Sequence, residues 1–271
     1  MSQPPRYTLN PVYKGAGLTE SFKAVIGDPN WLPTHYIVSL VHRADRRSKM
    51  IRKMEYSGLA YKLVDAYTPT DEIIRTHYGF RCPLQKRWGC NGSTLGPVIA
   101  CMVSHFKALR EFLASADDIA VVFEDDVILR FDYRERIRQL IDKYKDAPTF
   151  PNLIMLSPGI DPNRDELFAN TTSTWGALGY MITRTYAQHI LNTYDRRYID
   201  VSMIIRRDGI ACILNKHGAS SELIPMKSGG LVCSIPLVIE QPNEVSNLGN
   251  SISFHTNMFK KFGYENYITN Y

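Results

Sequence analysis

The chain has 271 residues, 44% of them hydrophobic and 22% charged, so it can bury a real core and is not disordered as a whole. Lys and Arg number 32 against 27 Asp and Glu, a net charge of +5. This mild excess fits a solvated basic surface, an anionic ligand such as a nucleotide, or an anionic membrane surface, and it does not select nucleic acid as a partner. The five cysteines form no Cys-x-x-Cys pair, which argues against a structural zinc site and fits a reducing compartment.

The first 34 residues are polar and carry Pro4, Pro5 and Pro11. They contain no apolar stretch of signal-peptide length, and no run in the chain reaches the roughly 18 apolar residues of a membrane span. We therefore expect a loosely packed arm over residues 1–34, followed by one domain over residues 35–271. We expect the protein to be cytoplasmic, without a transmembrane segment, either free or lying at a membrane surface.

The core begins with a short apolar run over residues 36–41, which predicts a buried strand. Asp45 is placed to cap a following helix, which ends before Gly58. Residues 61–64 then predict a second strand. Strand, helix and strand in this order indicate a parallel α/β sheet.

A long helix is predicted next, with Pro97 in its first turn and apolar residues at spacings of three and four up to Leu113. Residues 119–123 are entirely apolar, which is typical of a central strand. The other predicted elements are a charged helix over 132–144, strands over 153–156 and 179–182, and a helix over 185–191. From residue 217 onward, we expect loops that cover a site.

Three acidic residues, Glu124, Asp125 and Asp126, directly follow the apolar strand. Ligands of open α/β sheets bind at the carboxyl ends of strands. Residues two apart in an extended chain face the same way, so Glu124 and Asp126 can reach one point. Two carboxylates there suit Mg²⁺ or Mn²⁺. The alternative is a solvated acidic turn, but three like charges flanked by apolar residues on both sides are costly without compensation.

Four blocks of sequence occur in an order and spacing that together resemble a known family. They are residues 37–40 with Arg43, Asp45, Arg46 and Arg47; residues 64–66; residues 101–105 continuing through 120–127; and residues 179–183 with Ala187, Ile199 and Asp200. The chain resembles glycosyltransferase family 25, which includes lipopolysaccharide-type and collagen-type β-galactosyltransferases. Residues 236–241 with Ser246 are a weaker echo, and residues 97–100 depart from the family's usual Gly-Glu-Ile-Gly. That departure leaves the donor sugar open.

The resemblance implies an α/β fold, a GT-A-like single domain with a mostly parallel central sheet flanked by helices. It implies transfer of galactose, or a related hexose or pentose, from a nucleotide-diphosphate sugar. The donor is expected to be UDP-linked, the acceptor a hydroxyl of a glycan or glycoconjugate, and the outcome inversion. Mn²⁺ or Mg²⁺ is the implied cofactor, and nucleic acid is not an expected partner.

The resemblance also assigns site residues. The metal ligands would be Glu124, Asp126 and His255, with His217 as the alternative to His255. The general base would be Asp200, with Asp195 and Asp208 as alternatives. The nucleotide-sugar would contact Ser39, Leu40, Arg43, Arg46, Arg47, Asp65, Ala66, Ser104, Glu124 and Asp125.

Simpler roles stay open for several of these residues. The arginines suit phosphate but could solvate a helix start. Asp65 and Asp200 could be helix caps. His105 lies on the apolar stripe of the long helix and could be a hydrogen-bonded core residue, and Trp175 could be a sugar-stacking floor or a core aromatic.

Two other functions compete with the transferase. A metal-dependent phosphoesterase could use the same acids, but it normally needs more histidine and aspartate ligands. The chain has seven histidines, and no two of them are spaced as a pair of metal ligands. A non-catalytic nucleotide-sugar- or carbohydrate-binding protein is the other, and the intact acidic triplet argues against it.

Overall fold

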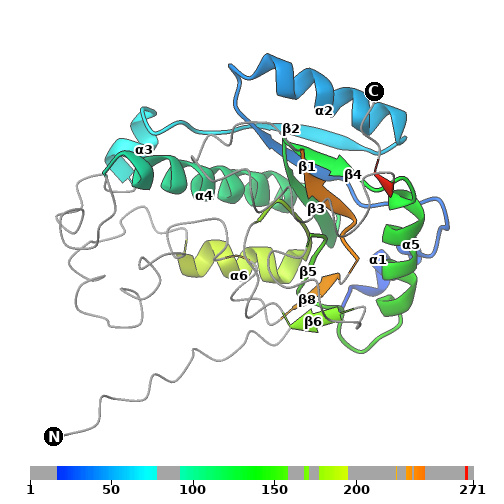
Figure 1. The fold of residues 1–271 in the computed structure, drawn as a ribbon. Coiled ribbons are helices and arrows are strands. Elements are labelled where there is room, and N and C mark those ends of the chain that lie inside the picture. Colours follow the sequence, from blue (N-terminus) through cyan, green and yellow to red (C-terminus); the bar gives the residue numbers. More distant parts are fainter. Residues whose placement is uncertain are drawn as a thin grey trace, which may run out of the picture.

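The computed structural model describes residues 17–77, 92–157, 168–170, 177–194, 224, 230–233, 235–241 and 266–267. A seven-stranded sheet in the order β2-β1-β3-β7-β5-β8-β6 forms its centre, and a second sheet pairs β4 with β9 (Figure 1). The strands are β1 (His35–Ser39), β2 (Tyr61–Asp65), β3 (Ile119–Glu124), β4 (Val127–Leu129), β5 (Leu153–Met155), β6 (Phe168–Asn170), β7 (Gly179–Thr183), β8 (Leu231–Cys233) and β9 (Val238–Glu240). The helices are α1 (Glu20–Ile26), α2 (Ala44–Tyr56), α3 (Glu72–His77), α4 (Gly92–Leu113), α5 (Tyr133–Tyr144) and α6 (Arg184–Tyr194).

The central sheet is mostly parallel, as predicted. Strand β1 lies between β2 and β3 and is parallel to both. Strand β7 runs antiparallel to β3 and β5, and β5 is parallel to β8. Only β6 and β7 therefore run against the other five strands of this sheet. The predicted α/β class with helices flanking the sheet is confirmed.

Helices cover both faces of this sheet because its strands alternate side chains between two apolar clusters. One cluster packs residues such as Val38 and Val122 against α4 and α6. The other packs Ile37 and Val121, their neighbours in the strands, against α1, α2 and α5. In Figure 1, α2 lies on one side of β1 and β3 and α4 on the other. The result is three layers, helix on sheet on helix.

Two boundaries differ from the sequence analysis. Helix α2 begins after Arg43 rather than at Asp45, and Asp45 lies in its first turn, where its carboxylate accepts a hydrogen bond from Arg43 Nε at 3.0 Å. Helix α4 begins at Gly92, so Pro97 lies inside it and removes one backbone hydrogen bond there. Gly58 does follow the end of α2, with a φ of 59° that glycine adopts without strain.

Part of the predicted loose arm packs onto the domain. Helix α1 is capped by Thr19, whose hydroxyl accepts a hydrogen bond from Phe22 N. Phe22 and Ile26 are buried in the same cluster as α2 and α5. Strands β8 and β9 likewise stand where the sequence predicted only loops. Among the residues that the structure describes, no helix combines the length and apolar character needed to cross a membrane.

Candidate functional site

A cavity of about 300 Å³ opens where three parallel strands end. Ser39 ends β1, Asp65 ends β2 and Glu124 ends β3. The cavity is lined by Val38, Ser39, Leu40, His42, Arg46, Ala66, Tyr67, Thr68, Pro69, Pro97, Ala100, Cys101, Ser104, Glu124, Asp125 and Asp126. Parallel strands bring their carboxyl ends to one edge, so residues distant in sequence meet there.

The acidic turn, residues Glu124–Asp126 between β3 and β4, forms one wall of this cavity. Ser39 Oγ donates a hydrogen bond of 2.6 Å to Asp125 Oδ2. Arg46 Nη1 lies 3.3 Å from Asp125 Oδ1 and 2.9 Å from Asp126 Oδ2. The side chain of Arg46 is only 3% exposed, so its guanidinium interacts with both carboxylates with little screening by water. The turn is therefore held in a fixed orientation.

Hydrogen bonds from Gln241 and Lys53 to backbone carbonyls hold the turn and the start of β4 in place. Gln241 N donates a hydrogen bond of 2.7 Å to the carbonyl of Asp126, next to the pairing of β4 with β9. Lys53, buried on α2, donates one of 2.6 Å to the carbonyl of Val127. Its Nζ also lies 3.4 Å from Gln241 Oε1.

The electrostatics of the turn favour a cation. Burial raises the pKa of Asp126 well above its usual value, and the charges of Glu124 and Glu240 raise it further. Burial also raises the pKa of Asp125, against the lowering effect of Ser39 and Arg46. The three carboxylates of the turn and the buried guanidinium that pairs with two of them sum to two net negative charges when all are ionised.

One oxygen of Asp126 is unsatisfied. Asp126 Oδ1 is buried and has no hydrogen-bond partner among the described residues. A buried polar atom without a partner costs about 1–3 kcal/mol, more when charged. A divalent ion with oxygen ligands would satisfy this atom and balance the two charges, so the acidic turn fits Mn²⁺ or Mg²⁺.

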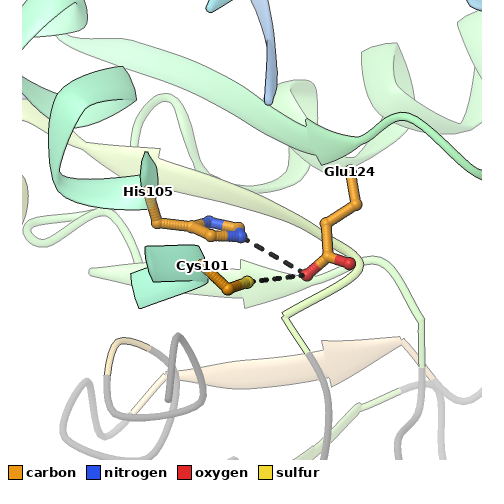
Figure 2. A group of neighbouring side chains, drawn as sticks. All are labelled: Cys101, His105 and Glu124. Carbon is orange, nitrogen blue, oxygen red and sulfur yellow. Dashed lines mark hydrogen bonds and ion pairs between the residues drawn. The ribbon is translucent and has the colours of Figure 1, made fainter. Parts of the chain in front are cut away.

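A second group of possible ligands adjoins the turn. Cys101 and His105 lie one turn apart on α4, and both face Glu124 (Figure 2). His105 Nε2 is 3.4 Å and Cys101 Sγ 4.0 Å from Glu124 Oε1. His105 Nδ1 lies 3.0 Å from the hydroxyl of Tyr180 on β7. His105 is thus the buried, hydrogen-bonded core residue that the sequence allowed, but its second nitrogen faces the site.

The structure brings most of the predicted donor-site residues together. The predicted residues that line the cavity are Ser39, Leu40, Arg46, Ala66, Ser104, Glu124, Asp125 and Asp126. Arg43, Arg47 and Asp65 are not among its lining residues: Arg43 pairs with Asp45 at 2.9 Å, and Arg47 pairs with Asp65 at 2.8 Å. The contacts of the ten predicted donor-site residues with a donor, and the role of Asp126 as a metal ligand, stay predictions.

The remaining predicted residues lie outside the described part of the chain. They are the candidate bases Asp195, Asp200 and Asp208, the candidate ligands His217 and His255, and Trp175. The sequence analysis missed Lys53, whose place beside Met50 and Met54 on the buried face of α2 is an unusual position for a lysine. It also missed the segment Tyr67–Pro69, which lines the cavity just after β2.

Residues 32–205 match the model of glycosyltransferase family 25, described as an LPS biosynthesis protein family. The chain belongs to this family. The match contains β1 through α6, and with them every residue that lines the cavity. The prediction made from the four sequence blocks is confirmed at the level of the family.

Curated members of family 25 resemble the chain over parts of their length. Procollagen galactosyltransferase 1-A of Xenopus laevis is 27% identical over 174 residues, which cover 58% of this chain and 28% of the relative. A probable inactive glycosyltransferase 25 family member 3 of Bos taurus is 25% identical over 199 residues, covering 62% and 32%. The chain therefore spans about a third or less of these relatives. The relatives include both transferases and members named inactive, so membership alone does not decide activity.

Proposed function

We propose that the chain is a metal-dependent glycosyltransferase. It moves a sugar, galactose or a related hexose or pentose, from a UDP-linked donor to a hydroxyl of a glycan or glycoconjugate. The observation that carries this proposal is the acidic turn at the carboxyl ends of β1 and β3, with one unsatisfied carboxylate oxygen in a cavity of about 300 Å³. Relatives named procollagen galactosyltransferases support the class of reaction.

Glu124 and Asp126 would hold the divalent ion. When bound, Mn²⁺ or Mg²⁺ supplies positive charge to a diphosphate leaving group. Arg46 holds Asp125 and Asp126 at 3.3 and 2.9 Å, so the two carboxylates keep their positions before any ligand arrives. Such preorganisation lowers the cost of ordering the site when the donor binds.

The donor would lie along the ends of β1 and β2. Ser104 does not offer a free hydroxyl there, because its Oγ accepts a hydrogen bond from Tyr67 N and donates one to the carbonyl of Ala100. Its hydrogen bond with Tyr67 N helps to position Tyr67, which lines the cavity. An aromatic ring at this place suits stacking against a nucleobase or a sugar.

The acceptor hydroxyl needs a general base on the face opposite the leaving group if the reaction inverts configuration. Asp200 remains the candidate, by the resemblance of its sequence block to the family. His255 remains the candidate third metal ligand, because such folds often take a third ligand from their C-terminal region. Arg43 and Arg47 are candidates for diphosphate contact once their carboxylate partners exchange with a donor.

The test is release of nucleotide from a panel of nucleotide sugars, with Mn²⁺ and with a chelator. We expect slow hydrolysis of one donor that needs the metal and falls at least about a hundredfold in Asp126→Asn, as when a group that stabilises the transition state is lost. The matched control is Asp142→Asn, which makes the same substitution on α5, where Asp142 pairs with Arg138. Hydrolysis that survives in Asp126→Asn and with chelator would refute the metal-dependent mechanism.

A second candidate is a nucleotide-sugar-binding protein without turnover. Relatives named inactive, including one from Homo sapiens that is 29% identical over 129 residues, favour it. Binding of a donor in the presence of Mn²⁺, with no hydrolysis and no transfer to any acceptor tested, would establish it in place of the transferase.

A further inference from the structure

The group of Cys101, His105 and Glu124 beside the acidic turn carries ligands of a different chemical kind. One sulfur, one ring nitrogen and one carboxylate oxygen lie within 4.8 Å of one another (Figure 2). Carboxylates alone suit Mg²⁺ and Mn²⁺, whereas a thiolate and an imidazole select zinc and related transition metals. We propose that this group is a site for Zn²⁺ or a similar transition-metal ion, distinct from the Mn²⁺ or Mg²⁺ site of the acidic turn.

The distances approach those of a tetrahedral zinc site. Zinc bonds of about 2.1 Å to nitrogen and oxygen and about 2.3 Å to sulfur separate the N and O ligands by about 3.4 Å and the S and O ligands by about 3.6 Å. The observed separations are 3.4 Å from His105 Nε2 to Glu124 Oε1 and 4.0 Å from Cys101 Sγ to the same oxygen. All three ligand atoms lie within 4.8 Å of one another, so Cys101 Sγ would move closer to the other two when an ion binds.

The surroundings resemble those of a ligating histidine. A metal-bound histidine almost always uses its other ring nitrogen for a hydrogen bond that fixes the ring. His105 Nδ1 lies 3.0 Å from the hydroxyl of Tyr180, and the two rings stack at 5.8 Å between centroids. Nε2 is thereby directed at Glu124, as ligation requires.

The site also has an entry path and an open position. Cys101 and Glu124 line the cavity, whereas His105 is fully buried behind them. An ion would enter from the cavity, displace the thiol proton of Cys101 to solvent, and keep water as its fourth ligand. Because Glu124 belongs to both groups, an ion held here would compete with Mn²⁺ at the acidic turn.

Cobalt is the probe for the site, since Co²⁺ adopts zinc geometries and absorbs light when bound to a thiolate. We expect the wild type to bind one Co²⁺ with a thiolate-to-cobalt absorption band that Zn²⁺ abolishes. Cys101→Ser should lose this band, and Co²⁺ affinity should fall by at least about a hundredfold, beyond the loss typical of second-shell changes. Cys233→Ser is the matched control, because Cys233 is a free cysteine buried in β8, away from the group.

A band that persists in folded Cys101→Ser would come from another cysteine and would overturn the proposal. His105→Gln provides a second variant should Cys101→Ser fail to fold, and it should weaken Co²⁺ binding similarly. An unchanged affinity in His105→Gln would also overturn it. This measurement needs no sugar donor, so its outcome is independent of the proposed transferase activity.

The competition between ions rests on the proposed function and has a test of its own. With Mn²⁺ held constant, added Zn²⁺ should inhibit donor hydrolysis by the wild type. Rates are compared with each protein's own rate without zinc. The Zn²⁺ concentration that halves the rate should be at least about tenfold higher for Cys101→Ser than for the wild type, which corresponds to about 1.4 kcal/mol of binding free energy. Equal inhibition of both proteins would show that zinc acts elsewhere, even where the Co²⁺ site is present.

Discussion

Replacing Arg46 with methionine should weaken the fold and strengthen cation binding at the same time. The guanidinium lies 2.9 Å from Asp126 Oδ2 and 3.3 Å from Asp125 Oδ1. At an effective dielectric constant of about 20, these separations correspond to gross attractions of about 6 and 5 kcal/mol. Desolvation offsets much of this, and removing one partner of a buried pair typically costs about 3–5 kcal/mol. We therefore expect Arg46→Met to lose about 3–5 kcal/mol of unfolding free energy without metal.

The effect on Mn²⁺ has the opposite sign. With all its carboxylates ionised, the acidic turn carries three net negative charges without Arg46 rather than two, so a divalent ion gains more by binding there. An ion that binds only the native state stabilises it according to its concentration and affinity. A tenfold gain in affinity adds about 1.4 kcal/mol of stabilisation at saturating concentrations. Mn²⁺ should thus restore part of the stability that Arg46→Met loses.

Urea unfolding with and without Mn²⁺ measures both effects in one experiment. Arg134→Met is the matched control, because Arg134 lies on α5 and donates to the carbonyls of Ser57 and Gly58, far from the turn. It should change stability by less than about 1 kcal/mol, as surface substitutions do, and leave the Mn²⁺ effect as in the wild type. A loss under about 1 kcal/mol in Arg46→Met, or a Mn²⁺ stabilisation no larger than the wild type's, would refute the charge assignment.

Two further predictions concern strands β1 and β7 of the central sheet. Burial lowers the pKa of His35 to about 4, so only the unfolded chain gains its proton between about pH 6.5 and 4, and stability falls as the pH drops through that window. From pH 7.5 to 5.0 the wild type should lose about 2 kcal/mol more than His35→Gln in urea unfolding; parallel losses would disprove this. Gly179→Ala would place a methyl group 2.7 Å from Val238 and 3.0 Å from Phe123, so it should cost about 1–3 kcal/mol in thermal unfolding, and a wild-type midpoint would contradict that crowding.

Much of the fold could be predicted from local pattern. The runs at β1 and β3 are apolar on both faces, which indicates central strands covered by helices, and the structure buries them against two clusters. Helix ends were harder to place, because they depend on tertiary contacts. Pro97 is a typical first-turn residue, yet α4 starts at Gly92. Strands β8 and β9 are three residues long, too short for a periodicity to register.

The candidate site was predictable only in part. Glu124–Asp126 followed from their place after an apolar strand, which is a feature of local sequence. The pairing of Arg46 with the acidic turn could not be predicted, because the sequence does not distinguish Arg43, Arg46 and Arg47. Only the packing of α2 places Arg46, and not the other two, against the acidic turn. The pairing of Cys101 and His105 with Glu124 was hidden for the same reason, since it joins α4 to β3.

The support of the acidic turn by Gln241 also bears on the order of folding. The acidic turn is synthesised before β9, which pairs with β4, and before Gln241, which donates to the carbonyl of Asp126. Lys53 must also reach both Val127 and Gln241. Contacts between distant parts of a chain form slowly, after the entropy of closing the intervening loop has been lost. The sheet can assemble around β1 and β3 before the contacts of the acidic turn with Gln241 have formed. The acidic turn would then be the last part of the domain to reach its native structure, and the first to be affected by damage near Gln241.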